Sequence, residues 1–254
     1  MILAIDVGNT NTVIGCIEQG NIQNTTRIRT ESGLTAVEYG IKLRQIFDFF
    51  DLDSRAFAGA ILSSVVPPVT EALRQAIEWV TGGRCLLVRP GMKTGMNVRL
   101  DDPAALGCDL VVGSVAAIAE YGAPLIILDL GTATTISVVD ENRGFRGGAI
   151  LPGVKLGYQA LSAGTSLLPD IAIRAPKKCI GANTADCMRS GAVFGTAAAI
   201  DGMIERMEQE LGQRCRVVAT GGLAASIVPH CRREIICDDQ LLLKGLWLLY
   251  EKNT

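Results

Sequence analysis

Two segments of the chain share one pattern: a short apolar run ends in Asp and is followed by a Gly-centred turn rich in Asn and Thr. They occupy residues 2–12 and 125–135 of a chain of 254 residues. The apolar runs predict buried strands, and glycine lets the backbone approach a ligand closely. Hydroxyl and backbone N–H groups in such turns cradle phosphate oxygens. One turn alone also fits a hairpin that binds nothing, but two predict a phosphate-binding turn in each of two lobes, with a nucleotide between them.

The composition excludes several classes of function. Hydrophobic residues make up 48% of the chain and its net charge is −2. No cluster of Lys and Arg exceeds two adjacent residues, so nucleic acid is not expected as a partner. Uncharged stretches fall short of the ~18 residues that a membrane span needs, and no leader peptide precedes the first strand. We therefore expect a cytoplasmic protein without a membrane segment.

Cysteine and histidine usage limits the chemistry further. The eight cysteines form no C-x-x-C pair, which favours reduced thiols over disulfides or a zinc site. His230 is the only histidine and has no neighbouring ligand pair, so we expect a loop position for it. A general base in this chain is therefore expected to be a carboxylate.

The pattern of apolar residues and turns predicts an α/β protein with two lobes, residues 1–118 and 119–254. A helix over 35–50 is expected to place Val37, Ile41, Ile46 and Phe49 on one face. The glycine-rich segment 90–108 reads as a functional loop. Further strands are expected at 2–6, 12–18, 22–29, 57–63, 85–88, 125–129, 134–140, 145–150 and 215–219. Further helices are expected at 67–80, 109–120, 184–211 and 241–250, and after residues 152 and 222.

Eight short motifs follow one another along almost the whole chain. They are D-V-G-N-T-N at 6–11, K-T-G at 93–95, D-D-P at 101–103, G-C-D-L at 107–110, D-L-G-T-A-T-T at 129–135, G-G-A-I-L-P-G at 147–153, N-T at 183–184 and T-G-G at 220–222. This series resembles the type III pantothenate kinases, within the actin, sugar-kinase and Hsp70 superfamily. The resemblance implies an actin-like ATPase fold, with two ribonuclease-H-like lobes whose mixed five-stranded sheets are flanked by helices.

The resemblance also implies an activity and its cofactors. Members of the family phosphorylate pantothenate to 4′-phosphopantothenate with ATP, the first step of coenzyme A biosynthesis. The implied cofactors are ATP, Mg²⁺ and a monovalent cation, potassium or ammonium. The implied partner is a second copy of the chain, in a homodimer formed through the second lobe, to which the small residues of the helix expected at 184–211 add support.

Individual residues take roles from the matching motifs. Asp109 is implied as the general base, Asp6 as the group that holds Mg²⁺ through water, and Asp129 as a ligand of the monovalent cation. The implied ATP-binding residues are Asp6, Val7, Gly8, Asn9, Thr10, Asn11, Thr12, Val13, Gly131 and Thr132. The implied pantothenate-binding residues are Leu100, Gly107, Cys108, Asp109, Leu110 and Thr184. Sequence alone also allows helix N-caps at Asp109 and Thr184 and a solvated loop position for Lys93.

Three positions depart from the family pattern. The family usually has Tyr at the position of Leu100, Arg at that of Leu110 and Asn at that of Asp102. An Arg offers five hydrogen-bond donors and a permanent charge, whereas Leu offers none. These departures leave three functions open: a weaker pantothenate kinase, a kinase for another small hydroxyl compound, and a non-catalytic nucleotide-binding protein with a regulatory role.

Overall fold

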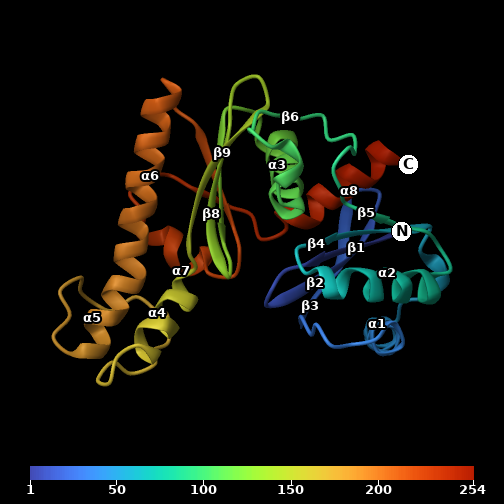
Figure 1. The fold of residues 1–254 in the computed structure, drawn as a ribbon, viewed down its shortest axis with the longest axis horizontal. Coiled ribbons are helices and arrows are strands. Elements are labelled where there is room, and N and C mark those ends of the chain that lie inside the picture. Colours follow the sequence, from blue (N-terminus) through green and yellow to red (C-terminus); the bar gives the residue numbers. More distant parts are fainter. The chain divides into compact units, whose positions relative to one another are not determined.

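The computed structural model describes residues 1–254, and the chain forms two compact units (Figure 1). The N-terminal unit contains Met1–Met96, Asp101–Ala116 and Gln240–Thr254. The C-terminal unit contains Asn97–Leu100 and Ala117–Asp239. The division at 118/119 expected from the sequence therefore differs from these units in three places: residues 117–118, a short segment near residue 100, and the C-terminal helix.

The N-terminal unit is built on a mixed five-stranded sheet, as the sequence predicts. Its strands are β1 Ile2–Val7, β2 Asn11–Glu18, β3 Asn21–Arg29, β4 Gly59–Ser64 and β5 Cys85–Leu87, in the order β3-β2-β1-β4-β5. β1 pairs antiparallel with β2 and parallel with β4. All six residues of the central strand β1 are buried. Asp6 therefore lies near the carboxyl end of the strand in the middle of the sheet.

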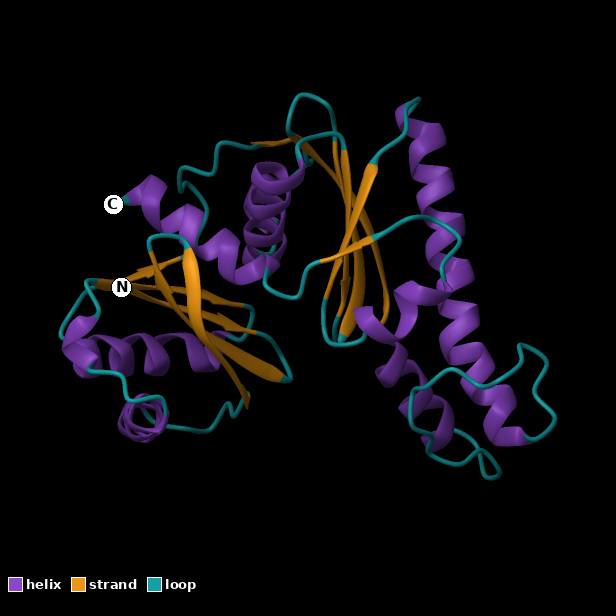
Figure 2. Cartoon of the chain, turned by 180° about the vertical axis from the view of Figure 1, so that it is seen from behind, coloured by secondary structure: helices purple, strands orange, loops and turns teal.

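Helices cover both faces of this sheet (Figures 1 and 2). α1 (Ala36–Phe49) and α2 (Pro67–Thr81) pack on one face. α1 begins with a capping box in which Thr35 and Glu38 satisfy each other's backbone N–H groups. α8 (Leu241–Asn253) and the first turns of α3 (Cys108–Tyr121) pack on the other face.

The structure corrects two sequence-based expectations for these helices. The buried side of α1 carries Tyr39, Leu43 and Phe47, while Val37 and Phe49 point to solvent, with 61% and 82% of their surface exposed. The C-terminal helix α8 belongs to the N-terminal unit, because its leucines pack into an apolar cluster with residues of β1, β2 and β4.

The C-terminal unit repeats the design with six strands, where the sequence analysis expected five. They are β6 Asn97–Val98, β7 Leu125–Leu130, β8 Ala133–Val139, β9 Gly144–Pro152, β10 Arg216–Thr220 and β11 Ile236–Cys237, in the order β11-β10-β7-β8-β9-β6. Two of these strands lie outside the expected ranges: β6, which lies in the glycine-rich segment 90–108 and pairs in parallel with β9, and β11, which pairs in parallel with β10.

This unit contains four further helices, of which the last two contribute residues to the apolar cluster on one face of its sheet (Figure 2). They are α4 Val154–Ala163, α5 Thr184–Ser190, α6 Thr196–Leu211 and the short α7 Ala224–Ile227. A π-helical turn, Gly191–Gly195, joins α5 to α6, so the helix expected over 184–211 is present with this local irregularity. Short 3-10 turns complete the elements, at Ser54–Ala56, Pro103–Ala105 and Val228–His230. No helix in the structure has the length and apolarity needed to cross a bilayer.

Candidate active site

The first phosphate turn begins where β1 ends. Asp6 is buried and lies in register with Val13 of β2 and Ser63 of β4. The N–H of Gly8 donates to the carbonyl of Asn11 at 3.0 Å, which closes the turn. The turn therefore projects from the middle of the sheet beside a buried carboxylate.

Thr30 fixes this turn from the neighbouring strand, a role that sequence analysis missed. Its hydroxyl donates to the carbonyl of Gly8 at 2.7 Å and lies 3.0 Å from the hydroxyl of Thr12. Thr12 is buried, whereas Asn9 and Thr10 are exposed. The turn's tip is therefore exposed to solvent, while the Thr12 hydroxyl lies inside and contacts that of Thr30. No sequence signal marks Thr30, because its position depends on the pairing of β3 with β2.

The predicted base lies in the first turn of α3, which begins one residue earlier, at Cys108. Asp109 is therefore not the N-cap of the helix. Its Oδ1 accepts a hydrogen bond from the backbone N–H of Leu110 at 2.8 Å. A Cβ on Gly107 would lie only 2.6 Å from the same oxygen, so the absence of a side chain at 107 leaves room for the carboxylate.

The thiol of Cys108 connects this helix start to the end of β4. Its Sγ donates to the carbonyl of Ser64 at 3.2 Å and lies 3.4 Å from the hydroxyl of Ser63. Because Ser63 is in register with Asp6, the contact sets Asp109 beside the carboxyl end of β1. The N-terminal unit thus brings together Asp6, the first phosphate turn and the predicted base.

Burial governs the electrostatics of this corner. It raises the pKa of the Asp109 carboxyl above its ordinary value, against the lowering effect of the backbone hydrogen bonds that it accepts. Burial also raises the pKa of the Cys108 thiol, and the nearby carboxylates of Asp109 and Asp6 raise it further. Cys108 therefore stays a neutral thiol that positions the helix, while Asp109 has the elevated basicity of a proton acceptor.

The second phosphate turn closes around Asp129 in the C-terminal unit. The N–H of Gly131 donates to the carbonyl of Ala133 at 3.1 Å. Asp129 lies in register with Thr220 of β10, at the start of the T-G-G motif. Gly221 has a φ of +95°, and a Cβ there would lie 2.4 Å from Oδ1 of Asp129. Only glycine fits at 221, so the T-G-G motif lines the cation-binding candidate.

The remaining predicted residues occupy separate places. Thr184 is the exposed first residue of α5, but the N-cap is Asn183, whose side chain accepts from the N–H of Asp186 at 2.9 Å. Leu100 lies in the C-terminal unit, with its Cδ2 3.3 Å from the Cβ position of Gly147. Leu110 belongs to the N-terminal unit and is partly exposed.

Lys93 and His230, which the sequence analysis also considered, make contacts with other parts of the protein. Lys93 is exposed, and its backbone N–H and carbonyl bond to the side chain of Asn253 at 2.9 and 3.0 Å. This is the solvated loop position that the sequence allows for it. The predicted loop position of His230 is a short 3-10 turn, where its ring meets Phe194 edge-on at 5.2 Å.

Solved structures of other proteins share this fold. A Campylobacter jejuni protein described as a Baf family transcriptional activator has a TM-score of 0.58 at 18% identity, covering 99% of this chain and 98% of that chain. An inorganic polyphosphate/ATP-glucomannokinase from an Arthrobacter species scores 0.51 at 12% identity, covering 97% and 96%. Component A of (R)-2-hydroxyglutaryl-CoA dehydratase from Acidaminococcus fermentans scores 0.58 at 13% identity, covering 98% and 96%. These similarities define the class: the chain has the actin-like α/β fold of sugar kinases and related ATPases.

Sequence comparison then identifies the family. A model of the family described as type III pantothenate kinase matches residues 2–206. A type III pantothenate kinase from an Exiguobacterium species is 42% identical over 253 residues, covering 100% of this chain and 99% of the relative. The chain belongs to the type III pantothenate kinase family, phosphotransferases that use ATP to phosphorylate pantothenate for coenzyme A biosynthesis.

Proposed function

We propose that the chain transfers the γ-phosphoryl group of ATP to the hydroxyl of pantothenate, with Asp109 as the general base. The observation that carries this assignment is the partly buried Asp109 carboxylate, held by a backbone N–H next to the Asp6 turn. The product is 4′-phosphopantothenate. Because ATP is the donor, we place the reaction in the cytoplasm.

Phosphoryl transfer requires mainly positioning and charge stabilisation from a protein. The Asp109 carboxylate would accept the hydroxyl proton as the oxygen attacks the γ-phosphorus. A raised pKa suits this task, because a base is most effective when its pKa approaches the working pH. The two turns, at residues 6–13 and 131–132, would hold the phosphate oxygens through backbone N–H groups and hydroxyls.

Two cations complete the proposal. The structure contains no cluster of three or more His, Cys, Asp or Glu side chains arranged to hold a metal. Mg²⁺ does not need such a cluster when water and substrate phosphates supply most of its ligands, so Asp6 would hold it through a water molecule. Asp129, between two glycine turns, would hold the monovalent cation, potassium or ammonium. Both cations would neutralise phosphate charge.

Pantothenate would lie against the loop that precedes α3. Gly107, Cys108 and Leu110 surround Asp109 in sequence and space, and they form one side of the proposed site. Leu100 and Thr184, the other two residues that the family resemblance assigns to pantothenate, belong to the C-terminal unit. With leucine at both departing positions, this set offers the substrate fewer hydrogen bonds than the family pattern.

An ATP-consumption assay tests this proposal. The parent protein should consume ATP only with pantothenate, Mg²⁺ and potassium or ammonium present. Asp109→Asn should lower kcat by ~10²–10⁴ and leave ATP affinity within a few-fold. Asp101→Asn is the matched control, since Asp101 is exposed in the same loop. Near-normal turnover by Asp109→Asn would remove Asp109 from the mechanism.

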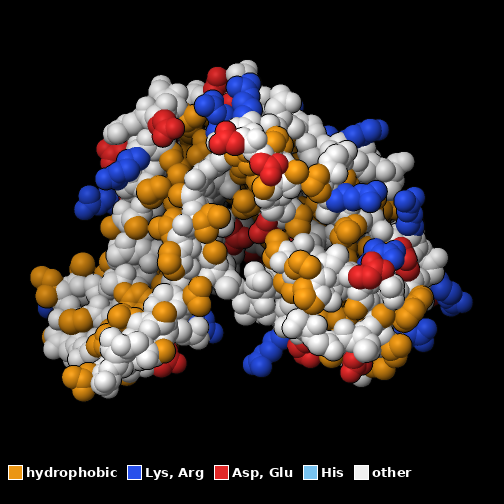
Figure 3. All heavy atoms as spheres, viewed as in Figure 1, with side chains coloured by type: hydrophobic (Ala, Val, Ile, Leu, Met, Phe, Trp, Pro, Cys, Tyr) orange, Lys and Arg blue, Asp and Glu red, His pale blue; other side chains and the backbone are white.

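We also propose a homodimer formed through the C-terminal unit. Figure 3 shows hydrophobic side chains gathered over the region of α4 and α5. Leu167 and Ile180 are 89% and 88% exposed there. Apolar surface of this kind marks protein interfaces, and the occupant we assign is a second copy of the chain. The other exposed members are Ile150, Leu156 and Leu161.

Sedimentation separates this dimer from a monomer. The double variant Leu167→Glu, Ile180→Glu should sediment as a monomer with lowered activity, whereas the parent should be a dimer activated by potassium or ammonium. Phe49→Glu provides a control, because Phe49 is 82% exposed on the N-terminal unit. A monomeric parent, or equal activity when Na⁺ replaces potassium, contradicts the corresponding half of the proposal.

A further inference from the structure

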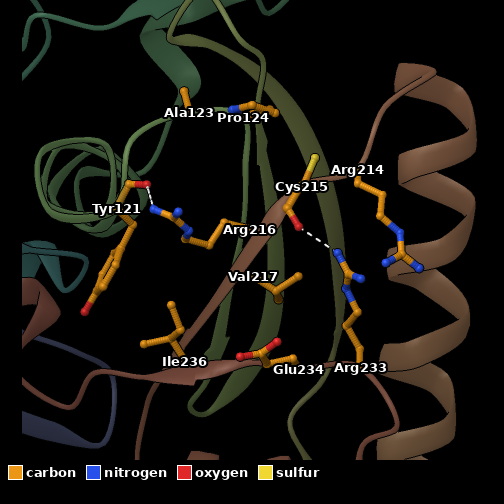
Figure 4. Close-up of a pocket in the computed structure, with 10 residues that line it drawn as sticks. All are labelled: Tyr121, Ala123, Pro124, Arg214, Cys215, Arg216, Val217, Arg233, Glu234 and Ile236. Atoms are coloured by element: carbon orange, nitrogen blue, oxygen red, sulfur yellow. Dashed lines mark hydrogen bonds between the residues drawn. The ribbon is translucent and has the colours of Figure 1, made fainter.

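A polar pocket lies in the C-terminal unit (Figure 4). It is at the opposite end of β7 and β10 from Asp129 and the turn that follows it. Its volume is about 410 Å³, within the range of small-molecule sites. Arg216 at the pocket begins β10, and Thr220, which pairs in register with Asp129, ends it. At about 3.3 Å per residue, the strand separates the two places by roughly 13 Å.

Three arginines line this pocket, and two of them have no acidic partner. Arg214 makes no hydrogen bond or ion pair with the protein, and the side chain of Arg216 donates to the backbone carbonyl of Tyr121. Glu234 lines the pocket as well and forms no ion pair. Arg214, Arg216 and Glu234 together therefore give the pocket a net charge of about +1.

The third arginine is held rigidly and keeps one donor unused. Nη2 of Arg233 donates to Glu208 and to the carbonyl of Cys215, both at 2.7 Å. Its Nε is buried and has no acceptor. A buried donor without a partner costs free energy, so an acceptor supplied by a ligand or by water completes this side chain. Figure 4 shows Arg214 and Arg233 on one side of β10 and Arg216 on the other.

The rest of the lining is suited to an organic group. Val217, Ile236 and Pro124 contribute apolar surface, and the ring of Tyr121 stands at one side (Figure 4). Guanidinium groups match phosphate oxygens with paired donors, and the Glu234 carboxylate accepts from a hydroxyl or amino group. The volume also exceeds what a bare inorganic phosphate fills.

We propose that this pocket binds a small phosphate ester, with its phosphate on Arg214 and Arg233, which lie on one side of β10, and a hydroxyl or amino group on Glu234. None of the residues assigned above to ATP, pantothenate or the cations lines this pocket, so nothing in the proposed kinase reaction requires it. It is a second ligand site of the enzyme, for an organic phosphate other than its substrates.

Calorimetric titration with glycerol phosphate tests the proposal. The enzyme is first saturated with Mg²⁺, a non-hydrolysable ATP analogue and pantothenate, so that the active site is occupied. Arg214→Gln should weaken binding at least about tenfold, the loss typical of a charge-assisted hydrogen bond. Arg214 is exposed and makes no hydrogen bond or ion pair within the protein, so this change should leave the melting temperature unaltered. Arg206→Gln is the control, because Arg206 is exposed on α6 away from the pocket.

Two further titrations define the chemistry. Glycerate, which carries a carboxylate in place of the phosphate, should bind more weakly than glycerol phosphate. Glu234→Gln should tighten the binding of inorganic phosphate several-fold, because it removes a like charge. Failure of glycerol phosphate to bind, equal losses in Arg214→Gln and Arg206→Gln, or glycerate binding as tightly would each overturn the proposal.

Discussion

Replacing Gly107 with Ala is expected to remove most of the kinase activity without unfolding the protein. The added Cβ would lie 2.6 Å from Oδ1 of Asp109, whereas ordinary contacts begin at 3.4 Å. The carboxylate must therefore move by about 0.8 Å, since overlapping atoms repel steeply. That movement also disturbs the 2.8 Å hydrogen bond from the N–H of Leu110.

The expected loss follows from the size of this displacement. A misplacement of about 1 Å in a catalytic group costs on the order of 10²-fold in rate, so kcat should fall by ~10–100-fold, or up to about 2.7 kcal/mol of barrier. Stability should not fall in parallel. Gly107 does not have a positive φ, and Gly→Ala at a compatible position stabilises a protein by ~0.4–1 kcal/mol.

Steady-state kinetics and thermal melting together test this reasoning. Gly113→Ala is the matched control in α3, because its Cβ would meet only Leu242, at an ordinary distance of 3.5 Å. Only the variant at 107 should lose kcat, with its KM for ATP unchanged. Full activity of Gly107→Ala would refute the assigned position of the base, and equal losses in both variants would show that general disturbance of α3 is the cause.

Two further predictions concern pH and the substrate. Because burial raises the pKa of Asp109, its carboxyl stays protonated to higher pH than that of an ordinary Asp. If Asp109 is the base, kcat/KM should fall on acidification with a midpoint above pH 3.8, the ordinary pKa of Asp. A midpoint at or below that pH would contradict the assignment. Leu110→Arg should lower the KM for pantothenate by ~10–100-fold, more so when combined with Leu100→Tyr. An unchanged KM and a lower melting temperature would instead indicate a pocket shaped for a less polar substrate, with the new charge buried and unpaired.

The two Gly-centred turns after β1 and β7 were predictable from sequence because their signal is local. A buried strand that ends in Asp and is followed by a Gly-Asn-Thr turn depends on adjacent residues alone. The π-helical turn before α6 and the pairing of β6 with β9 depend on distant contacts, and the sequence analysis did not anticipate them. The same limit explains why Thr30 was missed, since its hydroxyl meets Gly8 from 22 positions away.

The orientation of α1 shows a different limit. Two apolar series share this helix at a spacing of four residues, one through Val37 and Ile41 and the other through Tyr39, Leu43 and Phe47. Periodicity cannot choose between them. The structure buries the second series. The ring centroids of Phe47 and Phe57 are 5.0 Å apart, and the Tyr39 hydroxyl donates to the carbonyl of Glu31 at 2.6 Å. Partners outside the helix decide which face is buried.

Leucine in place of the family's arginine at position 110 can affect two things: the position of Asp109 and the binding of the substrate. The hydrogen bond that this residue makes with Asp109, the proposed base, comes from its backbone N–H, which any residue except proline supplies. Replacement of Arg by Leu therefore leaves Asp109 in place and removes only what the side chain offers to the substrate. A group that acts on binding but not on the base changes KM rather than kcat. For this reason we expect the leucine to weaken the hold on pantothenate while the phosphoryl-transfer step remains intact.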